Sequence, residues 1–258
     1  MTFDDLPTVR AVPTVTAAQM AEVDRVTIEE LHIPVEILME NAGRQIAAAA
    51  RVLLGGRVAG KRVIGLVGTG NNGGDAAVAL RHLTNWGARV CAEVAAPQDR
   101  VRETTRLQTT RLLLATTWEI AIVHDASQKG LRDLDADLLI DGLLGYSAKG
   151  APRETIATLI ETVTISNVPI LAVDLPSGIE PDSGATPGAA IHAAATVTLA
   201  LPKPGLLDQR RTAMLASCFS RISPSRTLLS RVSASTPEGS SRRAISFGSR
   251  LILNSNEH

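Results

Sequence analysis

Three short stretches rich in glycine and polar residues contain the side chains that could bind a ligand or transfer a proton. They are Gly68–Asp75 (GTGNNGGD), Asp141–Gly150 (DGLLGYSAKG) and Asp174–Gly178 (DLPSG). Glycines let a backbone approach a ligand closely, and the free N–H groups at the start of a helix attract a phosphate group. The carboxylates Asp141 and Asp174 can transfer a proton or hold a hard cation. The first stretch therefore indicates a site that binds an anion such as phosphate.

The first stretch contains the spacing G-x-G-x-x-G, formed by Gly68, Gly70 and Gly73. After a strand, this spacing is typical of dinucleotide-binding folds, in which an acidic residue about 20 positions later binds the ribose. Glu93 is roughly in range, but it lies inside its predicted strand. The spacing alone is a weak signal, so two alternatives stay open: an NAD(P)-dependent oxidoreductase, and a glycine turn without a ligand.

Apolar runs and helical patterns alternate along the chain. The runs that predict buried strands are Arg62–Val67, Arg89–Ala95, Ile120–Val123, Leu138–Asp141, Ile170–Asp174 and Ala194–Leu201. Helices are predicted after Thr16, which forms a capping box with Gln19, after Pro34, and over Gly74–Trp86, Val101–Thr116 and Pro152–Ile165. This alternation predicts a single-domain, three-layer α/β/α Rossmann-like fold with a mostly parallel, doubly wound sheet. Each glycine-rich stretch follows a strand, so all three should meet at the carboxyl edge of the sheet, where ligands bind.

Composition restricts the class of protein. The chain has 258 residues, of which 45% are hydrophobic, enough to bury the core of one large domain. Its formal net charge of +0 favours neither nucleic acid nor an anionic membrane as a partner. Two cysteines are too few for a disulfide framework or a metal cluster. The sequence shows no signal peptide and no apolar run of membrane-spanning length. We therefore expect a cytoplasmic protein.

Five motifs occur in order between Val15 and Leu207, and together they resemble one family. They are VTAAQMAEVDRVTIEELHIPVEILMENAGRQIA, VGTGNNGGDAAVALRHL, LIDGLLGYSAKG, AVDLPSGIEPDSG and TVTLALPKPGLL. The chain is similar to the YjeF N-terminal domain family, the NAD(P)H-hydrate epimerases. The resemblance implies a Rossmann-like fold, a homodimer, and an isomerase that interconverts the R and S epimers of NADHX and NADPHX, which are hydrated, damaged nicotinamide cofactors. It leaves open which of the two substrates is preferred.

The resemblance also implies roles for particular residues. The implied substrate-binding residues are Asn71, Asn72, Gly73, Gly74 and Asp75 in the first stretch, Gly145, Tyr146, Ser147, Ala148, Lys149, Gly150 and Ala151 in the second, and Asp174 in the third. A potassium ion is implied at Asn72, Asp141 and Ser177. An amide, a carboxylate and a hydroxyl supply the oxygen ligands that suit a hard cation. No organic cofactor beyond the substrate is implied.

Epimerisation at a hydrated carbon requires either loss and readdition of water or a transient ring opening. Both routes need proton transfer at oxygen and tolerance of a cationic ring. We expect Asp141 or Asp174 to serve as the catalytic carboxylate. Structural alternatives stay open: either aspartate could cap a turn at a strand end, Ser177 could shape a tight turn, and Lys149 could be a solvated lysine.

The chain is predicted to divide into an N-terminal tail (1–14), the epimerase domain (15–219) and an atypical Ser/Arg-rich tail (220–258). The residues after Leu207 cannot hold a kinase-like dehydratase domain, so the dehydratase that repairs the S epimer would be a separate protein. The last tail has no clear helix or strand period, which indicates either a flexible interaction segment or a shifted reading frame. A catalytically silent binding or dimerisation module is a further alternative. Convergence of Asn72, Asp141, Asp174 and Ser177 would argue against it.

Overall fold

The computed structural model describes residues 8–10, 13–115, 122–124, 135–207, 213–216, 243–246 and 251–253. Seven strands form a parallel array in the order β4-β3-β2-β5-β6-β7-β8, and three antiparallel strands, β10, β9 and β1, extend it beyond β8. The parallel strands are β2 (Arg62–Val67), β3 (Arg89–Val94), β4 (Ile122–His124), β5 (Leu138–Gly142), β6 (Ile170–Val173), β7 (Ala195–Leu199) and β8 (Ala213–Ala216). The antiparallel ones are β1 (Thr8–Arg10), β9 (Arg243–Ser246) and β10 (Leu251–Leu253).

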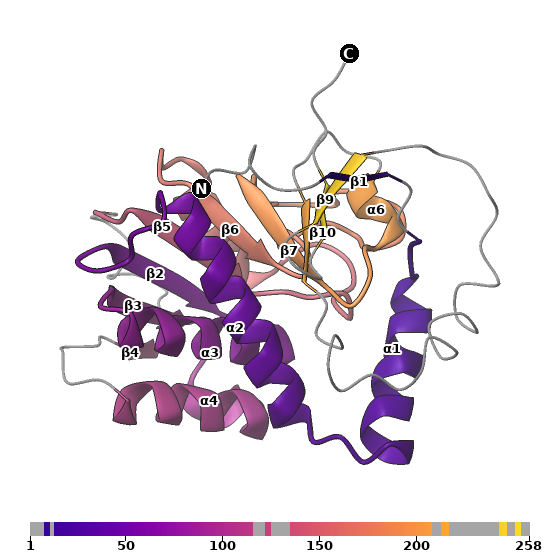
Figure 1. The fold of residues 1–258 in the computed structure, drawn as a ribbon, viewed down its shortest axis with the longest axis horizontal. Coiled ribbons are helices and arrows are strands. Elements are labelled where there is room, and N and C mark those ends of the chain that lie inside the picture. Colours follow the sequence, from indigo (N-terminus) through magenta and orange to yellow (C-terminus); the bar gives the residue numbers. More distant parts are fainter. Residues whose placement is uncertain are drawn as a thin grey trace.

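Helices cover both faces of this sheet, which gives three layers. The main helices are α1 (Ala17–Arg25), α2 (Val35–Leu53), α3 (Asn71–Asn85), α4 (Glu103–Leu114) and α5 (Glu154–Thr164); shorter turns are η2 (Val26–Glu30), η3 (Gln98–Arg100) and α6 (Pro204–Leu207). Figure 1 shows α2, α3 and α4 gathered on one side of the sheet. The buried side chains of α2 and α3 share a core with Val63 and Val67 of β2, whereas those of α5 pack with Leu66 and Leu139 from the opposite face. None of the helices in the described ranges is long and apolar enough to cross a bilayer.

The order of the parallel strands places a topological switch point between β2 and β5. The chain runs outward from β2 through β3 to β4, then returns to the other side of β2 and continues from β5 to β8. Loops that leave β2 and β5 therefore diverge and open a crevice at their carboxyl ends. Gly68 is required at this point, because a Cβ atom there would lie 1.9 Å from the carbonyl oxygen of Leu143. The two loops can approach each other this closely only with glycine.

The predicted fold class is confirmed, and β2 has the predicted bounds. One boundary prediction was wrong: α3 begins at Asn71 rather than Gly74, so the NNGGD stretch forms the first turn of the helix and not a loop. The capping box of Thr16 and Gln19 is confirmed by its two hydrogen bonds. Strands β9 and β10 lie within 220–258, where the sequence showed no strand period, and β9 pairs with β1 from the N-terminal tail. The rest of that predicted tail lies outside the described residues.

Candidate functional site

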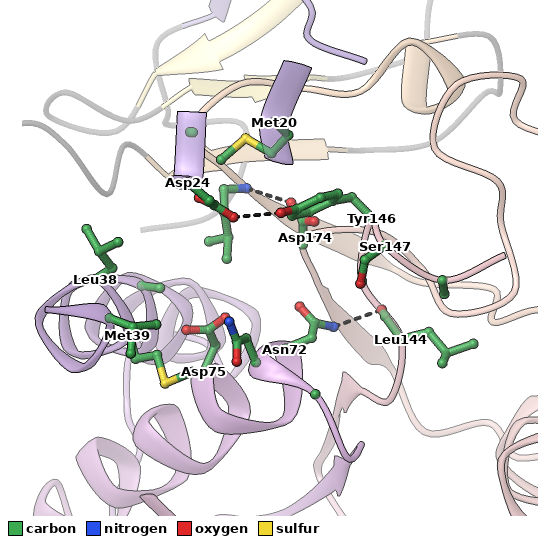
Figure 2. A pocket seen from close by; sticks show the side chains of 18 of the residues that line it. Met20, Asp24, Leu38, Met39, Asn72, Asp75, Leu144, Tyr146, Ser147 and Asp174 are labelled. Atoms are coloured by element: carbon green, nitrogen blue, oxygen red, sulfur yellow. Dashed lines mark hydrogen bonds between the residues drawn. The ribbon is translucent and has the colours of Figure 1, made fainter. Parts of the chain in front are cut away.

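A cavity of about 480 Å³ opens at the switch point. This volume is within the usual range for small-molecule sites. Figure 2 shows the side chains that face it, which come from α1, α2, α3, the loop after β5 and the end of β6. Its polar lining includes Asp24, Asn72, Asp75, Arg102, Tyr146, Asp174 and Lys203; its apolar lining includes Met20, Leu38, Met39 and Leu199. Segments that are distant in sequence thus form one site, as the three glycine-rich stretches predict.

Outside the cavity lining, Asp141 ties the end of β5 to the stretch that follows β6. Its carboxylate is completely buried and accepts hydrogen bonds from the backbone N–H of Ser177 (2.8 Å), the hydroxyl of Ser177 (2.6 Å) and the N–H of Leu143 (3.2 Å). Burial raises the pKa of Asp141 to about 6, although the hydrogen bonds from Ser177 act in the opposite direction. Asp141 does not line the cavity. Its position is that of an internal support for the loops that do.

Asn72 connects the same support to α3. Its side-chain amide donates to the carbonyl oxygens of Leu144 (2.8 Å) and Val173 (3.1 Å), and the N–H of Leu144 donates to the hydroxyl of Ser177 (2.9 Å). Asn72, Asp141 and Ser177 therefore belong to one hydrogen-bond network that joins β5, β6 and α3. Three of the four residues expected to converge thus meet in one network, and the fourth, Asp174, directly follows Val173, whose carbonyl accepts the Asn72 amide.

Asp174 stands at the carboxyl end of β6 with a left-handed backbone (φ 63°), which a non-glycine residue adopts only at a cost. Its carboxylate forms an ion pair with the ammonium group of Lys203, which is fully buried, and accepts the N–H of Leu199 at 3.2 Å. Lys203 also donates to the carbonyl of Leu199 (3.1 Å), and its nitrogen lies 5.8 Å from the centre of the Tyr146 ring. These contacts hold the Asp174 side chain at the wall of the cavity.

Asp24 and Tyr146 complete this wall. The hydroxyl of Tyr146 donates to the Asp24 carboxylate at 2.7 Å, which joins α1 to the loop after β5. Burial raises the pKa of Asp24, and the hydrogen bond from Tyr146 acts against that rise. Burial and the bond to Asp24 together raise the pKa of Tyr146. We refer to Asp24, Tyr146, Asp174 and Lys203 as the upper wall of the cavity.

Asp75 lies on the other side of the cavity, in the first turns of α3. Figure 2 shows its carboxyl group near Met39, separated by the cavity from Asp24 and Asp174. Its side chain is only 7% exposed, and it makes no hydrogen bond or ion pair with the residues that the structure describes. Burial is the largest cause that raises its pKa well above the usual range, and the negative charges of Asp174 and Asp24 add to it. A carboxyl group in this setting favours its neutral, protonated form.

The amino end of α3 offers donors to an anion. Its N-cap is Gly70, which has no side chain to bond the first free N–H groups of the helix. The start of α4 is held next to this end, because the hydroxyl of Thr105 donates to the Gly70 carbonyl (2.8 Å) and the N–H of Arg102 donates to the Thr69 carbonyl (3.0 Å). Arg102 is thereby placed at the exposed mouth of the cavity.

The structure brings together most, but not all, of the residues implied by the resemblance. Those that line the cavity are Asn71, Asn72, Asp75, Gly145, Tyr146, Ser147, Ala148 and Asp174; those that do not are Gly73, Gly74, Lys149, Gly150, Ala151, Asp141 and Ser177. Lys149 is exposed, as expected of a solvated lysine. Glu93 is buried beside Cys91 and does not line the cavity, so the acid expected of a dinucleotide-dependent oxidoreductase is absent from it.

Sequence reasoning missed Asp24 and Arg102, and for Lys203 it allowed two alternatives, a side chain that faces the site from the last strand or an exposed turn lysine. Asp24 sits in a helix with an irregular mixture of charged and apolar residues, and it lies 122 positions from its partner Tyr146. Lys203 follows a strand and is flanked by two prolines, a signal that is equally typical of an exposed turn. No local pattern relates these residues to the site. These residues reach the site only because α1 and the chain after β7 pack against it.

Comparison with known proteins identifies relatives of this architecture. Residues 35–205 match the family model described as YjeF-related protein N-terminus. The chain is 39% identical over 200 residues to a protein named NAD(P)H-hydrate epimerase from Dehalogenimonas lykanthroporepellens, an overlap of 78% of this chain and 79% of that protein. It is 37% identical to the Bifunctional NAD(P)H-hydrate repair enzyme Nnr of Moorella thermoacetica, covering 75% of this chain but only 37% of that protein. The crystal structure of yeast ynu0 (YNL200c) superposes with a TM-score of 0.75 and 25% identity, covering 88% of this chain and 96% of the yeast chain.

Proposed function

The chain belongs to the family of YjeF-related protein N-termini, and from this membership and the architecture of the cavity we propose that it is an NAD(P)H-hydrate epimerase. The reaction interconverts the R and S epimers of NADHX or NADPHX. The observation that carries the proposal is the cavity at the switch point, where an ion-paired carboxylate, Asp174, faces a buried carboxyl group without a counter-charge, Asp75. Relatives named as epimerases that match over most of their length support the same conclusion.

Asp174 is the proposed catalytic carboxylate. Epimerisation passes through a cationic ring, and the carboxylates of the upper wall would supply negative charge that stabilises such a cation. Lys203 and the Leu199 N–H both bond the Oδ1 atom of Asp174, which leaves Oδ2 to accept a proton or orient a water molecule. Asp141, the other expected catalytic residue, has its carboxylate enclosed by Ser177 and Leu143, and we assign it a supporting role.

The rest of the substrate is proposed to lie across the amino end of α3. A dinucleotide carries phosphate groups, and the free N–H groups after Gly70 are suitable donors to them. Arg102 at the cavity mouth adds a positive charge on the same side. Apolar side chains of the lining, such as Met20, Leu38 and Met39, would pack against the ring.

A potassium ion is proposed at Asn72, Asp141 and Ser177. The three side chains belong to one network, and they provide an amide, a carboxylate and a hydroxyl oxygen, which is a donor set suited to a hard cation. The buried Asp141 carboxylate has no cationic partner among the residues that the structure describes. A cation there would compensate this charge and fix the loops after β5 and β6. Added potassium, compared with tetramethylammonium, should raise the melting temperature of the wild type but not of Asp141→Asn.

The proposed biological setting is a cytoplasmic homodimer that works with a separate dehydratase. The match covers 37% of the bifunctional relative, whose name describes a repair enzyme with two functions, and this supports a functional partnership between the proposed epimerase and a second repair activity. Exposed apolar side chains at Ile28, Leu31 and Ile37, on η2 and the start of α2, offer a contact surface for a second copy. Sedimentation equilibrium tests the dimer, and replacing these three residues by serine should shift it to a monomer.

The function is tested with Asp174→Asn. We expect the variant to bind an NADP-type ligand within about threefold of the wild type, and to lose epimerisation by a factor of about 10² to 10⁴, the range typical of a lost general acid or base. Binding is measured by calorimetry and epimerisation by chromatographic separation of the R and S forms. Retained activity would remove Asp174 from the mechanism. Loss of binding together with activity would indicate a damaged pocket rather than a missing proton-transfer group.

A further inference from the structure

The two sides of the cavity differ in a way that the proposed function does not by itself explain. On the upper wall, each carboxylate has a partner: Asp174 has Lys203 and Asp24 has Tyr146. Across the cavity, Asp75 is only 7% exposed and lines the space. It has no hydrogen-bond partner in the described part of the chain. Because Asp75 lines the cavity and no described group bonds its carboxyl oxygens, a ligand in the cavity can supply the missing partner.

The position of Asp75 makes this partner specific. It is the fifth residue of α3, one turn beyond the free N–H groups at the start of the helix. A phosphate bound at those N–H groups would therefore not be the hydrogen-bond partner of the Asp75 carboxyl group. Next to it, Met39 and Gly74 pack closely, since a Cβ atom at Gly74 would lie 2.9 Å from the Met39 sulfur. This apolar surrounding fits the uncharged ring of the substrate better than its phosphates. A neutral carboxyl group there can donate a hydrogen bond to a hydroxyl group on the ring.

We propose that Asp75 is a second catalytic residue, which transfers a proton at one face of the nicotinamide ring while Asp174 does so at the other. The proposal rests on the epimerase function proposed above and assigns its stereochemistry. An epimerase must let a hydroxyl group leave from one face of a carbon and return to the opposite face. Figure 2 shows the two carboxyl groups on opposite sides of the cavity, which is the arrangement that this requires.

The step is balanced without any oxidant or reductant. The carboxylic acid of Asp75 gives its proton to the ring hydroxyl as the bond from carbon to oxygen breaks, which produces water, a ring cation and the Asp75 carboxylate. A water molecule on the other face then adds its oxygen to the same carbon and gives a proton to the Asp174 carboxylate. The ring is neutral again with inverted configuration, and one proton has moved from Asp75 to Asp174. The reverse direction uses the two residues in exchanged roles, and solvent returns the proton.

The test follows oxygen exchange in water enriched in ¹⁸O. Purified R and S substrates are incubated separately with the full-length protein, the epimers are separated by chromatography, and the ¹⁸O content of each is measured by mass spectrometry. The variants are Asp75→Asn and the double variant Asp174→Asn with Lys203→Met, which avoids a buried unpaired ammonium group. Asp135→Asn is the matched control, because Asp135 is exposed at the opposite edge of the sheet, where it pairs with Arg62.

In the wild type and in Asp135→Asn, we expect every inverted molecule to contain one ¹⁸O atom. Asp75→Asn should invert at least about 100-fold more slowly, which is the lower limit for a lost proton-transfer group. It should nevertheless exchange oxygen, without inversion, in one epimer only, because Asp174 can still release and return water on its own face. The double variant should show the same behaviour with the other epimer. A purely structural role for Asp75 would slow exchange in both epimers equally.

Three results would overturn the proposal while leaving the epimerase function intact. They are inversion by Asp75→Asn within about threefold of the wild type, inversion without ¹⁸O in the product, and equal loss of exchange in both epimers. If the wild type does not invert either epimer, the proposed function itself fails. Asp75→Ala, which adds no bulk, replaces Asp75→Asn if that variant does not fold.

Discussion

Asp141 and Asp75 are both buried aspartates on neighbouring elements of the same crevice, yet the structure treats them in opposite ways. Asp141 accepts three hydrogen bonds from Ser177 and Leu143 and does not reach the cavity. Asp75 accepts none from the described residues and faces the cavity. Burial raises the pKa of both, but only Asp141 has donors that oppose the rise. A raised pKa therefore does not by itself distinguish the two aspartates, whereas their contacts do: Asp141 is bonded within the protein, and Asp75 faces the cavity.

This contrast predicts that the partnered carboxylates stabilise the fold and that Asp75 does not. The largest effect is expected for the ion pair of Asp174 and Lys203. Lys203→Met leaves a buried carboxylate without its counter-charge and should lower the free energy of unfolding by about 3–5 kcal/mol. Urea denaturation measures this change. Adding Asp174→Asn should recover part of this loss. If the double variant instead loses as much free energy of unfolding as the two single variants together, Asp174 and Lys203 do not interact directly.

A smaller loss is expected at the support beneath the cavity. Asp141→Asn replaces one carboxylate oxygen by a donor that faces the N–H and hydroxyl of Ser177. Charge-assisted hydrogen bonds are lost and a buried donor is left unpaired, so the free energy of unfolding should fall by about 3 kcal/mol. Thermal and urea denaturation test this. An unchanged stability would mean that the network is not needed to hold β5 and β6 together.

Tyr146→Phe should cost about 1 kcal/mol, because it removes one hydrogen bond between partly buried groups but keeps the ring beside Lys203. The Asp24 carboxylate then loses the donor that lowers its pKa, so that pKa should rise further. NMR titration of the Asp24 carboxyl carbon measures the shift. If the variant keeps the stability of the wild type and the pKa of Asp24 does not change, Tyr146 does not hold α1 against the loop after β5.

The smallest effect, and the one with the opposite sign, is expected for Asp75→Asn. The folded protein holds the proton of Asp75 more tightly than the unfolded chain does, so stability is fully present below about pH 4 and decreases as the pH rises toward the folded pKa. Asparagine has no such charge. The variant should match the wild type within about 0.5 kcal/mol at pH 4 and become the more stable of the two by pH 8. A loss of stability at pH 8 would mean that Asp75 has an internal partner.

The sequence predicted the sheet and the place of the site because both depend on local patterns. An apolar run such as Arg62–Val67 specifies a buried strand, and parallel strands bring the ends of β2, β5 and β6 to one edge. The start of α3 was misjudged because two asparagines and two glycines are poor helix formers. Tertiary packing overrides this preference. A Cβ atom at Gly73 would lie 2.2 Å from the Gly68 carbonyl oxygen, so only glycine lets the first turn of α3 pack against the loop that precedes it.

The composition of the upper wall could not be predicted for a different reason. Asp24 reaches Tyr146 only because α1 packs beside the loop after β5, and Lys203 reaches Asp174 only because the chain turns back after β7. Contacts between residues so far apart leave no period or spacing in the sequence. The motifs indicated which loops form the site, and the structure adds which charges oppose one another across it.

The most direct test of the proposed epimerase site is to add purified protein to R-NADHX in the presence of potassium. The ratio of R to S is followed by chromatography and compared with the uncatalysed rate. We predict that the protein brings the two epimers to the same equilibrium as the slow spontaneous reaction, but faster, and that Asp75→Asn and Asp174→Asn each remove this acceleration while Asp135→Asn retains it. A folded wild-type protein that leaves the ratio at the uncatalysed rate would contradict the proposal and favour a binding module on the same fold.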